Sequence, residues 1–168
     1  MRILVDGYNV IRRLPELKAV EQAEGLQAGR EALCAHLRAY RRARGHAITV
    51  VFDGAGGSSA SSGAGGLTVC FSRAGETADA VIARLLKQGG GGAVVVSSDA
   101  AVAASALGAG AAAVTAEEFG ARLEAAALGV LKGLEEEEEA PSAPAKGKGP
   151  SRRLPKEERV RRARLRKL

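Results

Sequence analysis

The chain has 168 residues, a formal net charge of +6 and only 3% aromatic residues. This length suits one domain of ordinary size with an appendage, and no apolar run approaches the roughly 20 residues that span a bilayer. Two cysteines and two histidines without ligand spacing argue against a zinc cluster and against a disulfide framework. Because the first residues enter a strand directly, we expect no signal peptide and a cytoplasmic protein.

Residues 1–71 predict three strands, one helix and one long loop. The strands are short apolar runs, and the helix carries apolar residues at a spacing of three to four. In chain order we expect a strand at 2–5, a turn at 7–9, a helix at 27–44 with Gly45 after it, a strand at 48–52, a flexible Gly-Ala-Ser loop at 54–66 and an edge strand at 67–71.

The alternation of strands and helices continues to about residue 128. In chain order we expect a helix at 77–87, a strand at 93–96, a helix that starts at Ser98-Asp99, a strand at 111–114, and a helix at 115–128 with Thr115 and Glu118 as its capping box. This alternation predicts an α/β fold with a central, mostly parallel sheet and helices on both faces.

We place the end of the folded domain at residue 132, and residues 133–168 form an acidic run, a linker and a basic tail. Residues 146–168 hold 11 Lys or Arg and 2 Glu, a net charge of +9. Such a block favours a polyanion through counterion release, so RNA or the ribosome is a candidate partner. A solvated tail without a partner is the alternative.

Only four aspartates occur in the chain, at Asp6, Asp53, Asp79 and Asp99. Asp6, Asp53 and Asp99 stand at or shortly after the ends of predicted strands, and Asp79 lies at the start of a predicted helix. Since the ends of parallel strands converge on one edge of a sheet, these carboxylates predict a site for Mg²⁺ or Mn²⁺. Asp6, Asp79 and Asp99 are the ligand candidates, and Asp53 and Glu76 flank them.

Each acid also has a structural explanation. Asp53 before Gly54 suits a turn, Asp99 suits a helix N-cap, and Asp79 suits the first turn of a helix, where the dipole favours negative charge. Glu76 could be a solvated residue. Asp6 is the least easily explained in this way, because an unpaired carboxylate next to a buried strand is costly.

A metal ion at this edge could align a water with a phosphodiester bond and stabilise the charge that develops. Asn9 would orient a ligand or a phosphate, or else cap a turn. A basic surface could follow an RNA backbone, although an exposed helix face explains it nearly as well. This surface would comprise Arg12, Arg13, Arg41, Arg42 and Arg44.

The segment from Ile3 to Ile11, with the sequence ILVDGYNVI, resembles the opening motif of the YacP-like NYN nucleases, which belong to the PIN-like nuclease group. Three later segments resemble further motifs of that family in the same order: Val51 to Gly54, Gly75 to Asp79 and Val96 to Asp99. The resemblance covers roughly residues 1–125. It implies a PIN-like three-layer α/β/α sandwich and a metal-dependent endoribonuclease, and some members act on messenger RNA on the ribosome.

By the same resemblance, Asp6, Asp79 and Asp99 would carry the metal site, with Asn9, Asp53, Glu76 and Ser98 in support. The chain departs from some relatives at one position, because Asp79 is followed by Ala80 where they have a second acid. This departure leaves open a catalytically weak PIN-like module that binds RNA or the ribosome.

Three other classes of α/β protein fit less well. A phosphatase of the haloacid dehalogenase type needs a second Asp two residues after the first, where this chain has Tyr8. A receiver domain needs a Lys after a late strand, and here Thr115 follows Val114. A dinucleotide-binding fold needs a glycine fingerprint after its first strand, which is missing.

Overall fold

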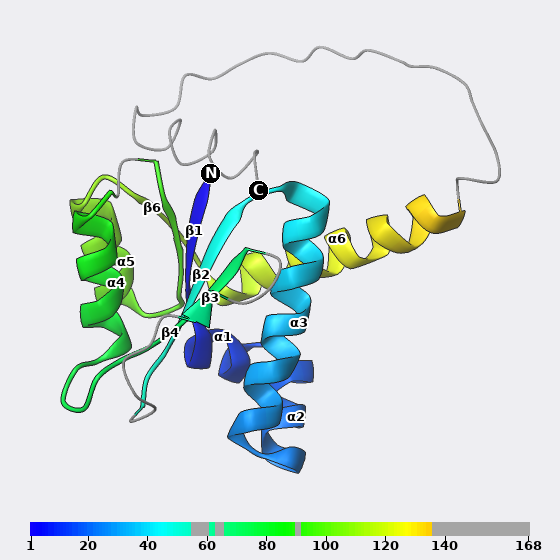
Figure 1. Ribbon diagram of the computed structural model, residues 1–168, viewed down its shortest axis with the longest axis horizontal. Helices are drawn as coiled ribbons and strands as arrows, with labels where there is room; N and C mark the ends of the chain where they lie inside the picture. Colours follow the sequence, from blue (N-terminus) through cyan, green and yellow to red (C-terminus); the bar gives the residue numbers. More distant parts are fainter. Residues whose placement is uncertain (55–60, 63–65, 90–91, 136–168) are drawn as a thin grey trace, which may run out of the picture.

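The computed structural model describes residues 1–54, 61–62, 66–89 and 92–135. Its centre is a six-stranded sheet in the order β3-β4-β2-β1-β5-β6 (Figure 1). Five strands run parallel, and β3 pairs antiparallel with β4 at one edge. The strands are β1 (Arg2–Asp6), β2 (Ala47–Phe52), β3 (Ser61–Ser62), β4 (Leu67–Phe71), β5 (Val94–Val96) and β6 (Ala112–Val114).

Six helices connect and cover the strands in the described part of the chain. They are α1 (Gly7–Arg13), α2 (Pro15–Glu24), α3 (Leu26–Arg44), α4 (Ala78–Lys87), α5 (Ala100–Gly108) and α6 (Ala116–Glu135). Because side chains alternate along a strand, β1 turns Ile3 and Val5 to one face of the sheet and Leu4 to the other. The first face is covered by α1, α2, α3 and α6, and the second by α4 and α5. The α/β/α sandwich with a mostly parallel sheet is therefore confirmed.

The predicted turn at residues 7–9 is wrong, because these residues open α1. The Asp6 side chain accepts a hydrogen bond from the backbone N–H of Asn9 and so caps the helix. Gly7 permits this direct change from strand to helix, since a Cβ at this position would meet the ring of Phe52. A further helix, α2, was not predicted, and Pro15 stands at its first position, where a proline ring is tolerated.

Most other elements lie within a few residues of their predicted bounds, but α6 continues to Glu135, well beyond the predicted end at residue 128. Thr115 and Glu118 form the predicted capping box of α6, with each side chain accepting from the other's backbone N–H. Within the predicted loop at 54–66, Ser61–Ser62 forms β3, whereas residues 55–60 and 63–65 lie outside the described residues. The predicted acidic run, linker and basic tail lie almost wholly outside them, apart from 133–135 in α6. A division after residue 132 therefore stays a prediction.

Candidate active site

Asp6 is the most buried of the four aspartates and lies where β1 passes into α1. Its side chain accepts hydrogen bonds from the N–H of Asn9 at 3.3 Å and from the Ser97 hydroxyl at 3.0 Å. Burial raises the pKa of Asp6 above its usual value, and these two hydrogen bonds oppose that rise. The charges of Asp79 and Asp99 raise the pKa further. The fold therefore brings three distant acids within electrostatic reach of each other.

Asp99 follows β5 and is the N-cap of α5, as one of the two sequence interpretations predicts. Its Oδ1 atom accepts from the N–H groups of Ala101 at 2.7 Å and Val102 at 3.3 Å. Both of these cap bonds use the same oxygen, which leaves Oδ2 available to a ligand. The capping role and a metal-binding role are therefore compatible.

Asp79 lies in the first turn of α4, where Thr77 caps the helix. Its side chain is largely exposed at the sheet edge, and its pKa is raised by partial burial and then by the charges of Asp99 and Asp53. Ala80 is exposed next to it and donates its backbone N–H to the Thr77 hydroxyl. A methyl group thus occupies the position where an additional acid would stand.

Asp53 follows β2 and forms a local bridge to the end of β4. Its Oδ1 accepts from the Ser72 hydroxyl at 2.6 Å, and that hydroxyl accepts the N–H of Gly54 at 3.1 Å. The bridge fixes the ends of two neighbouring strands, and the exposed Asp53 carboxylate borders the same cleft as Asp6. Asp53 combines this bridging role with a place in the acidic group, and the chain bends at Gly54 without forming the predicted turn.

Glu76 belongs to the acidic segment by sequence but is engaged elsewhere. It precedes α4 and forms an ion pair of 2.6 Å with Arg84 in the last turn of that helix. It does not line the cleft that Asp6, Asp53 and Asp79 share. The structure therefore gives Glu76 a role in holding the start of α4, and any part in catalysis stays a prediction.

Asn9 connects α1 to the segment that carries Asp99. Its Oδ1 accepts the backbone N–H of Ser98 at 2.8 Å. The Ser98 hydroxyl in turn donates to Glu117 at 2.7 Å and accepts the N–H of Ala116 at 3.0 Å. These bonds join the ends of β1 and β5 to the start of α6, so Asn9 and Ser98 position the acids relative to each other.

A cleft of about 990 Å³ opens at this edge of the sheet. Asp6, Asp53 and Asp79 line it together with Asn9, Arg12 and Arg13, whereas Asp99, one of the three predicted metal ligands, does not. Tyr8, Leu26, Arg30 and Phe71 also line it and were not predicted. Arg30 of α3 reaches the ring of Phe71 at the end of β4, and this contact arises only when the fold packs α3 beside β4.

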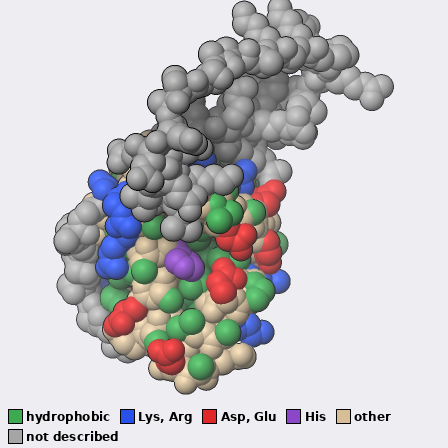
Figure 2. All heavy atoms as spheres, turned by 90° about the vertical axis from the view of Figure 1, so that its right-hand side faces the viewer, with side chains coloured by type: hydrophobic (Ala, Val, Ile, Leu, Met, Phe, Trp, Pro, Cys, Tyr) green, Lys and Arg blue, Asp and Glu red, His purple; other side chains and the backbone are tan. Residues whose placement is uncertain are grey.

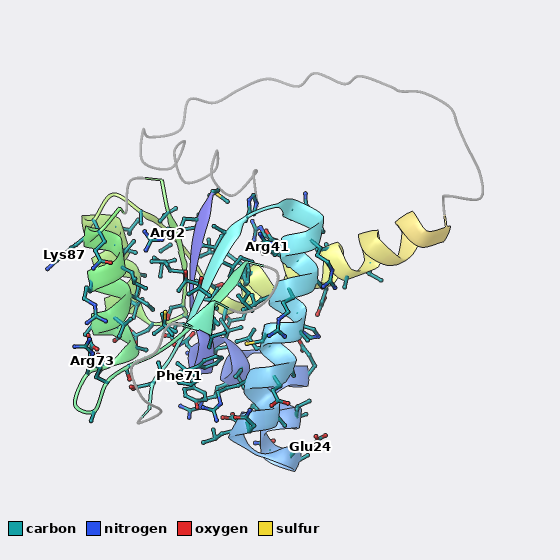
Figure 3. All side chains as sticks on the ribbon, viewed as in Figure 1. Arg2, Glu24, Arg41, Phe71, Arg73 and Lys87 are labelled. Atoms are coloured by element: carbon teal, nitrogen blue, oxygen red, sulfur yellow. The ribbon has the colours of Figure 1, made fainter. Side chains whose placement is uncertain are left out.

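The predicted basic surface is divided between two ends of the molecule. Arg12 and Arg13 reach the cleft from α1, whereas Arg41, Arg42 and Arg44 lie in the last turn of α3. A helix of 19 residues is about 28 Å long, so its two ends cannot serve one small site. In Figure 3, Arg41 and Arg2 lie toward one end of the sheet and Phe71 lies toward the other. The three α3 arginines therefore do not line the candidate site.

The acidic group has no basic partner among the described residues. The three ion pairs of this part of the chain all use glutamates, at Glu21, Glu76 and Glu117. All four aspartates offer hard oxygen donors. Burial is the main cause of the raised pKa values of Asp6 and Asp79, and the charges of neighbouring aspartates, which a cation would offset, raise them further. The donor chemistry fits Mg²⁺ or Mn²⁺.

The spacing of the acids sets a limit on such a site. No group of three or more His, Cys, Asp or Glu among the described residues is close enough to enclose a metal ion. A small cation that keeps several of its waters needs only one or two direct carboxylates. The arrangement thus suits a hydrated ion better than a closed cage of protein ligands.

The sequence matches the YacP-like NYN domain over residues 3–167. The chain belongs to the YacP-like NYN domain family. This is a family with a nuclease-type fold, so the resemblance seen in the four sequence motifs is confirmed. No curated protein matches the chain.

Solved structures place the NYN domain in three dimensions. The chain is similar to the crystal structure of Rae1 (YacP) from Bacillus subtilis, with 26% sequence identity and a TM-score of 0.71. That match covers 81% of this chain and 80% of the other. A mutant of the same Bacillus subtilis protein matches with the same identity and TM-score and covers 85% and 87%. The NYN fold thus accounts for most of both chains. None of the described helices is long and apolar enough to cross a membrane.

Proposed function

We propose that this chain is a metal-dependent endoribonuclease that cleaves RNA phosphodiester bonds at the cleft. The observation that carries the proposal is the group of aspartates at the carboxyl edge of the sheet, which has no basic partner in the described residues. Negative charge that faces an RNA phosphate would oppose binding unless a cation lies between them. Membership of a family with a nuclease-type fold supports the same reaction.

In this proposal Asp6, Asp79 and Asp99 hold Mg²⁺ or Mn²⁺, and Asp53 supports them from the neighbouring strand. The ion would polarise the phosphate and lower the pKa of a bound water. Asn9 and Ser98 keep the β1 and β5 ends in register through their 2.8 Å hydrogen bond. Arg12 and Arg13 border the cleft and would hold the phosphates on either side of the cleaved bond.

The RNA itself would be messenger RNA on the ribosome, as the family resemblance implies. The net charge of +9 in residues 146–168 supports this part of the proposal, because a basic segment favours contact with ribosomal RNA. In this proposal the cleft cleaves the messenger RNA and residues 146–168 bind the ribosome. The reaction would take place in the cytoplasm.

The test is cleavage of an end-labelled single-stranded RNA with Mg²⁺, with Mn²⁺ and with EDTA. We expect internal cuts only with metal, and Asp6→Asn should lower the rate by about a hundredfold or more, as loss of a charge-stabilising group does. Glu16→Gln is the matched control, because Glu16 is an exposed acid in the first turn of α2 and lies outside the cleft. Its rate should equal that of the wild type.

Equal metal-dependent cleavage by the wild type and by Asp6→Asn would contradict the metal site. The second candidate, a catalytically weak module that binds RNA or the ribosome, is favoured by one observation, the lack of three closely grouped acids in the described residues. Ala80 points the same way. RNA binding by both proteins without cleavage by either would establish this second candidate.

A further inference from the structure

Three of the five Phe and Tyr residues of the chain gather at the candidate cleft. The ring centroids of Tyr8 and Phe52 are 5.3 Å apart, and those of Phe52 and Phe71 are 5.8 Å apart. Phe52 is fully buried, whereas Tyr8 and Phe71 are only partly buried and line the cleft. The other two, Tyr40 and Phe119, pack on each other in the core. In a chain so poor in aromatics, two rings are thus left at the cleft surface.

An arginine guanidinium lies over each of the two rings at the cleft. The Arg12 guanidinium lies 5.4 Å from the centroid of Tyr8, and the Arg30 guanidinium lies 5.5 Å from that of Phe71. Such cation–π contacts hold a guanidinium plane near the ring. Three elements contribute to this pair of units, with Tyr8 and Arg12 on α1, Arg30 on α3 and Phe71 on β4. Figure 3 shows Phe71 at the end of β4 that faces α1.

The charge of Arg30 is only partly satisfied within the protein. Its terminal nitrogen donates to Gln27 at 2.8 Å, and its Nε is buried without a hydrogen-bond partner in the described residues. Arg12 approaches Glu21 at 4.0 Å, with the arginine side chain well exposed. Both cations therefore remain open to an anionic ligand, and their rings offer apolar surface next to it.

An aromatic ring beside a cation is the surface that unpaired nucleotides recognise. A base stacks on a ring or on a guanidinium plane, while the phosphate next to it pairs with the positive charge. The bases of a duplex are already stacked on each other and expose only their edges. An acidic peptide could use the cations, but it would gain nothing from the rings and would be repelled by Asp6, Asp53 and Asp79.

We propose that the cleft selects single-stranded RNA by stacking unpaired bases on the Tyr8–Arg12 and Phe71–Arg30 units. This inference rests on the proposed nuclease function and defines its substrate class. It assigns the specificity for unpaired RNA to these two units and the cleavage reaction to the aspartates. Tyr8 and Phe71 are thus binding residues, and their loss weakens the binding of RNA before any bond is broken.

The experiment measures binding in EDTA, so that cleavage does not interfere, and the repulsion between the metal-free aspartates and RNA is then the same for every variant that is compared. The probes are a single-stranded RNA that contains 2-aminopurine, whose fluorescence falls on stacking, and the same RNA annealed to its complement. We expect the wild type to quench the single strand and to bind it more tightly than the duplex. Tyr8→Leu and Phe71→Leu should each weaken binding of the single strand about tenfold and reduce the quenching.

Conservative variants separate the ring from other effects. Tyr8→Phe and Phe71→Tyr keep a ring and should bind and quench as the wild type does. Arg12→Lys keeps the charge without the planar surface, so binding should weaken less than in Arg12→Ala. Thermal unfolding of each variant checks that it folds, and the ring-retaining pair keeps the comparison valid if a leucine variant is unstable.

The outcomes separate this inference from the proposed reaction. Quenching that depends on Tyr8 and Phe71 supports base stacking on the two units even if no RNA is cleaved under any condition. Equal affinity for single strand and duplex, or leucine variants that quench as the wild type does, would overturn it even if Asp6→Asn abolishes cleavage. Loss of quenching in Tyr8→Phe as great as in Tyr8→Leu would also overturn it, because the hydroxyl and not the ring would then be responsible.

Discussion

Asn9 is one of the residues that place the acids relative to each other. Its side chain is the hydrogen-bond acceptor for Ser98, across 89 positions of sequence, and Ser98 immediately precedes Asp99. Its backbone N–H donates a hydrogen bond to the side chain of Asp6, the N-cap of α1. Asn9 thus contacts both strand ends that carry the acids. Its backbone N–H bonds Asp6 at the end of β1, and its side chain bonds the segment after β5.

We expect Asn9→Ala to destabilise the protein by about 1–3 kcal/mol, because it leaves the partly buried N–H of Ser98 without its acceptor. The variant should also need more metal for cleavage, with the rate largely recovered at high metal concentration. Urea unfolding and a metal titration of the cleavage rate measure the two effects.

Gln27→Ala is the matched control for stability, since it removes an amide whose hydrogen bonds to Arg30 and Glu31 are exposed. Its effect should stay within about 0.5 kcal/mol. An Asn9→Ala protein as stable as this control, with an unchanged metal requirement, would show that the Asn9–Ser98 bond does not position the site.

At the scale of elements, α1 depends on close packing against β2. Gly7 is the first residue of α1 and is buried, and a side chain there would meet the ring of Phe52. Phe52 cannot move far, because it is fully buried and contacts both Tyr8 and Phe71. The helix therefore approaches the sheet at a distance that only glycine allows.

We expect Gly7→Ala to lower the free energy of unfolding by about 1–3 kcal/mol, the usual cost of overpacking a core. Gly108→Ala in α5 is the matched control, because Gly108 is also helical, and a Cβ there would meet no atom within 4 Å. That substitution should be neutral or slightly stabilising, since alanine favours helices. Denaturant unfolding compares the two, and equal stability would contradict the packing argument.

The sequence predicted the sheet well because its strands are distinct apolar runs. The bounds of β4 are the predicted ones, and those of β1 and β2 differ by one residue at one end. The missed helices α1 and α2 did leave a signal, because Val10, Leu14 and Leu17 repeat at helical spacing and are all buried. The pattern was outweighed by Gly7 and Asn9, which favour turns, and by Pro15, which favours a break.

The site was predictable only in part, for a physical reason. Asp6, Asp53 and Asp99 follow strands, so the parallel sheet alone brings them to one edge. The contribution of Phe71 and Arg30 depends on which face of α3 meets β4, and no local pattern gives that. Arg41 lies in the last turn of a helix about 28 Å long, far from the end that borders the cleft. The sequence alone did not show that this distance separates Arg41 from Arg12.

At the scale of the whole molecule, the acidic edge sets a relation between pH and stability. Burial and like charges raise the pKa values of Asp6 and Asp79 above their ordinary value of 3.8. The folded state then binds these protons more tightly than the unfolded state, so the stabilisation is full below that value and is lost as pH rises through the raised values. We expect the metal-free protein to lose stability from about pH 4 upward through this effect.

Divalent metal should reverse that loss by mass action, with about 2.7 kcal/mol gained at a concentration 100 times the dissociation constant. Asp6→Asn should flatten the dependence on pH and should be at least as stable as the wild type in EDTA near neutral pH. Urea unfolding across this range, with EDTA and with Mg²⁺, measures both effects, and Glu16→Gln is again the control. A wild type that gains stability as steeply as Asp6→Asn between acid and neutral pH would contradict the sign.

A surface beyond the cleft is also basic. Figure 2 shows the side of the molecule that is on the right in Figure 1, where Lys and Arg side chains gather along one margin. The last turn of α3 contributes Arg41, Arg42 and Arg44 to the basic residues outside the cleft. Contact of these arginines with RNA stays a prediction, and it would concern a long substrate and not the bond that is cleaved.

The four aspartates stand at the ends of four different segments, from Asp6 near the start to Asp99 beyond the middle. A chain that is still being synthesised has no such group until β5 has joined β1 and brought Asp99 to Asp6. An unfinished or unfolded copy therefore carries the aspartates without the acidic group that they form in the fold. In the proposed function, cleavage would therefore wait until the chain has been made and folded at least as far as Asp99.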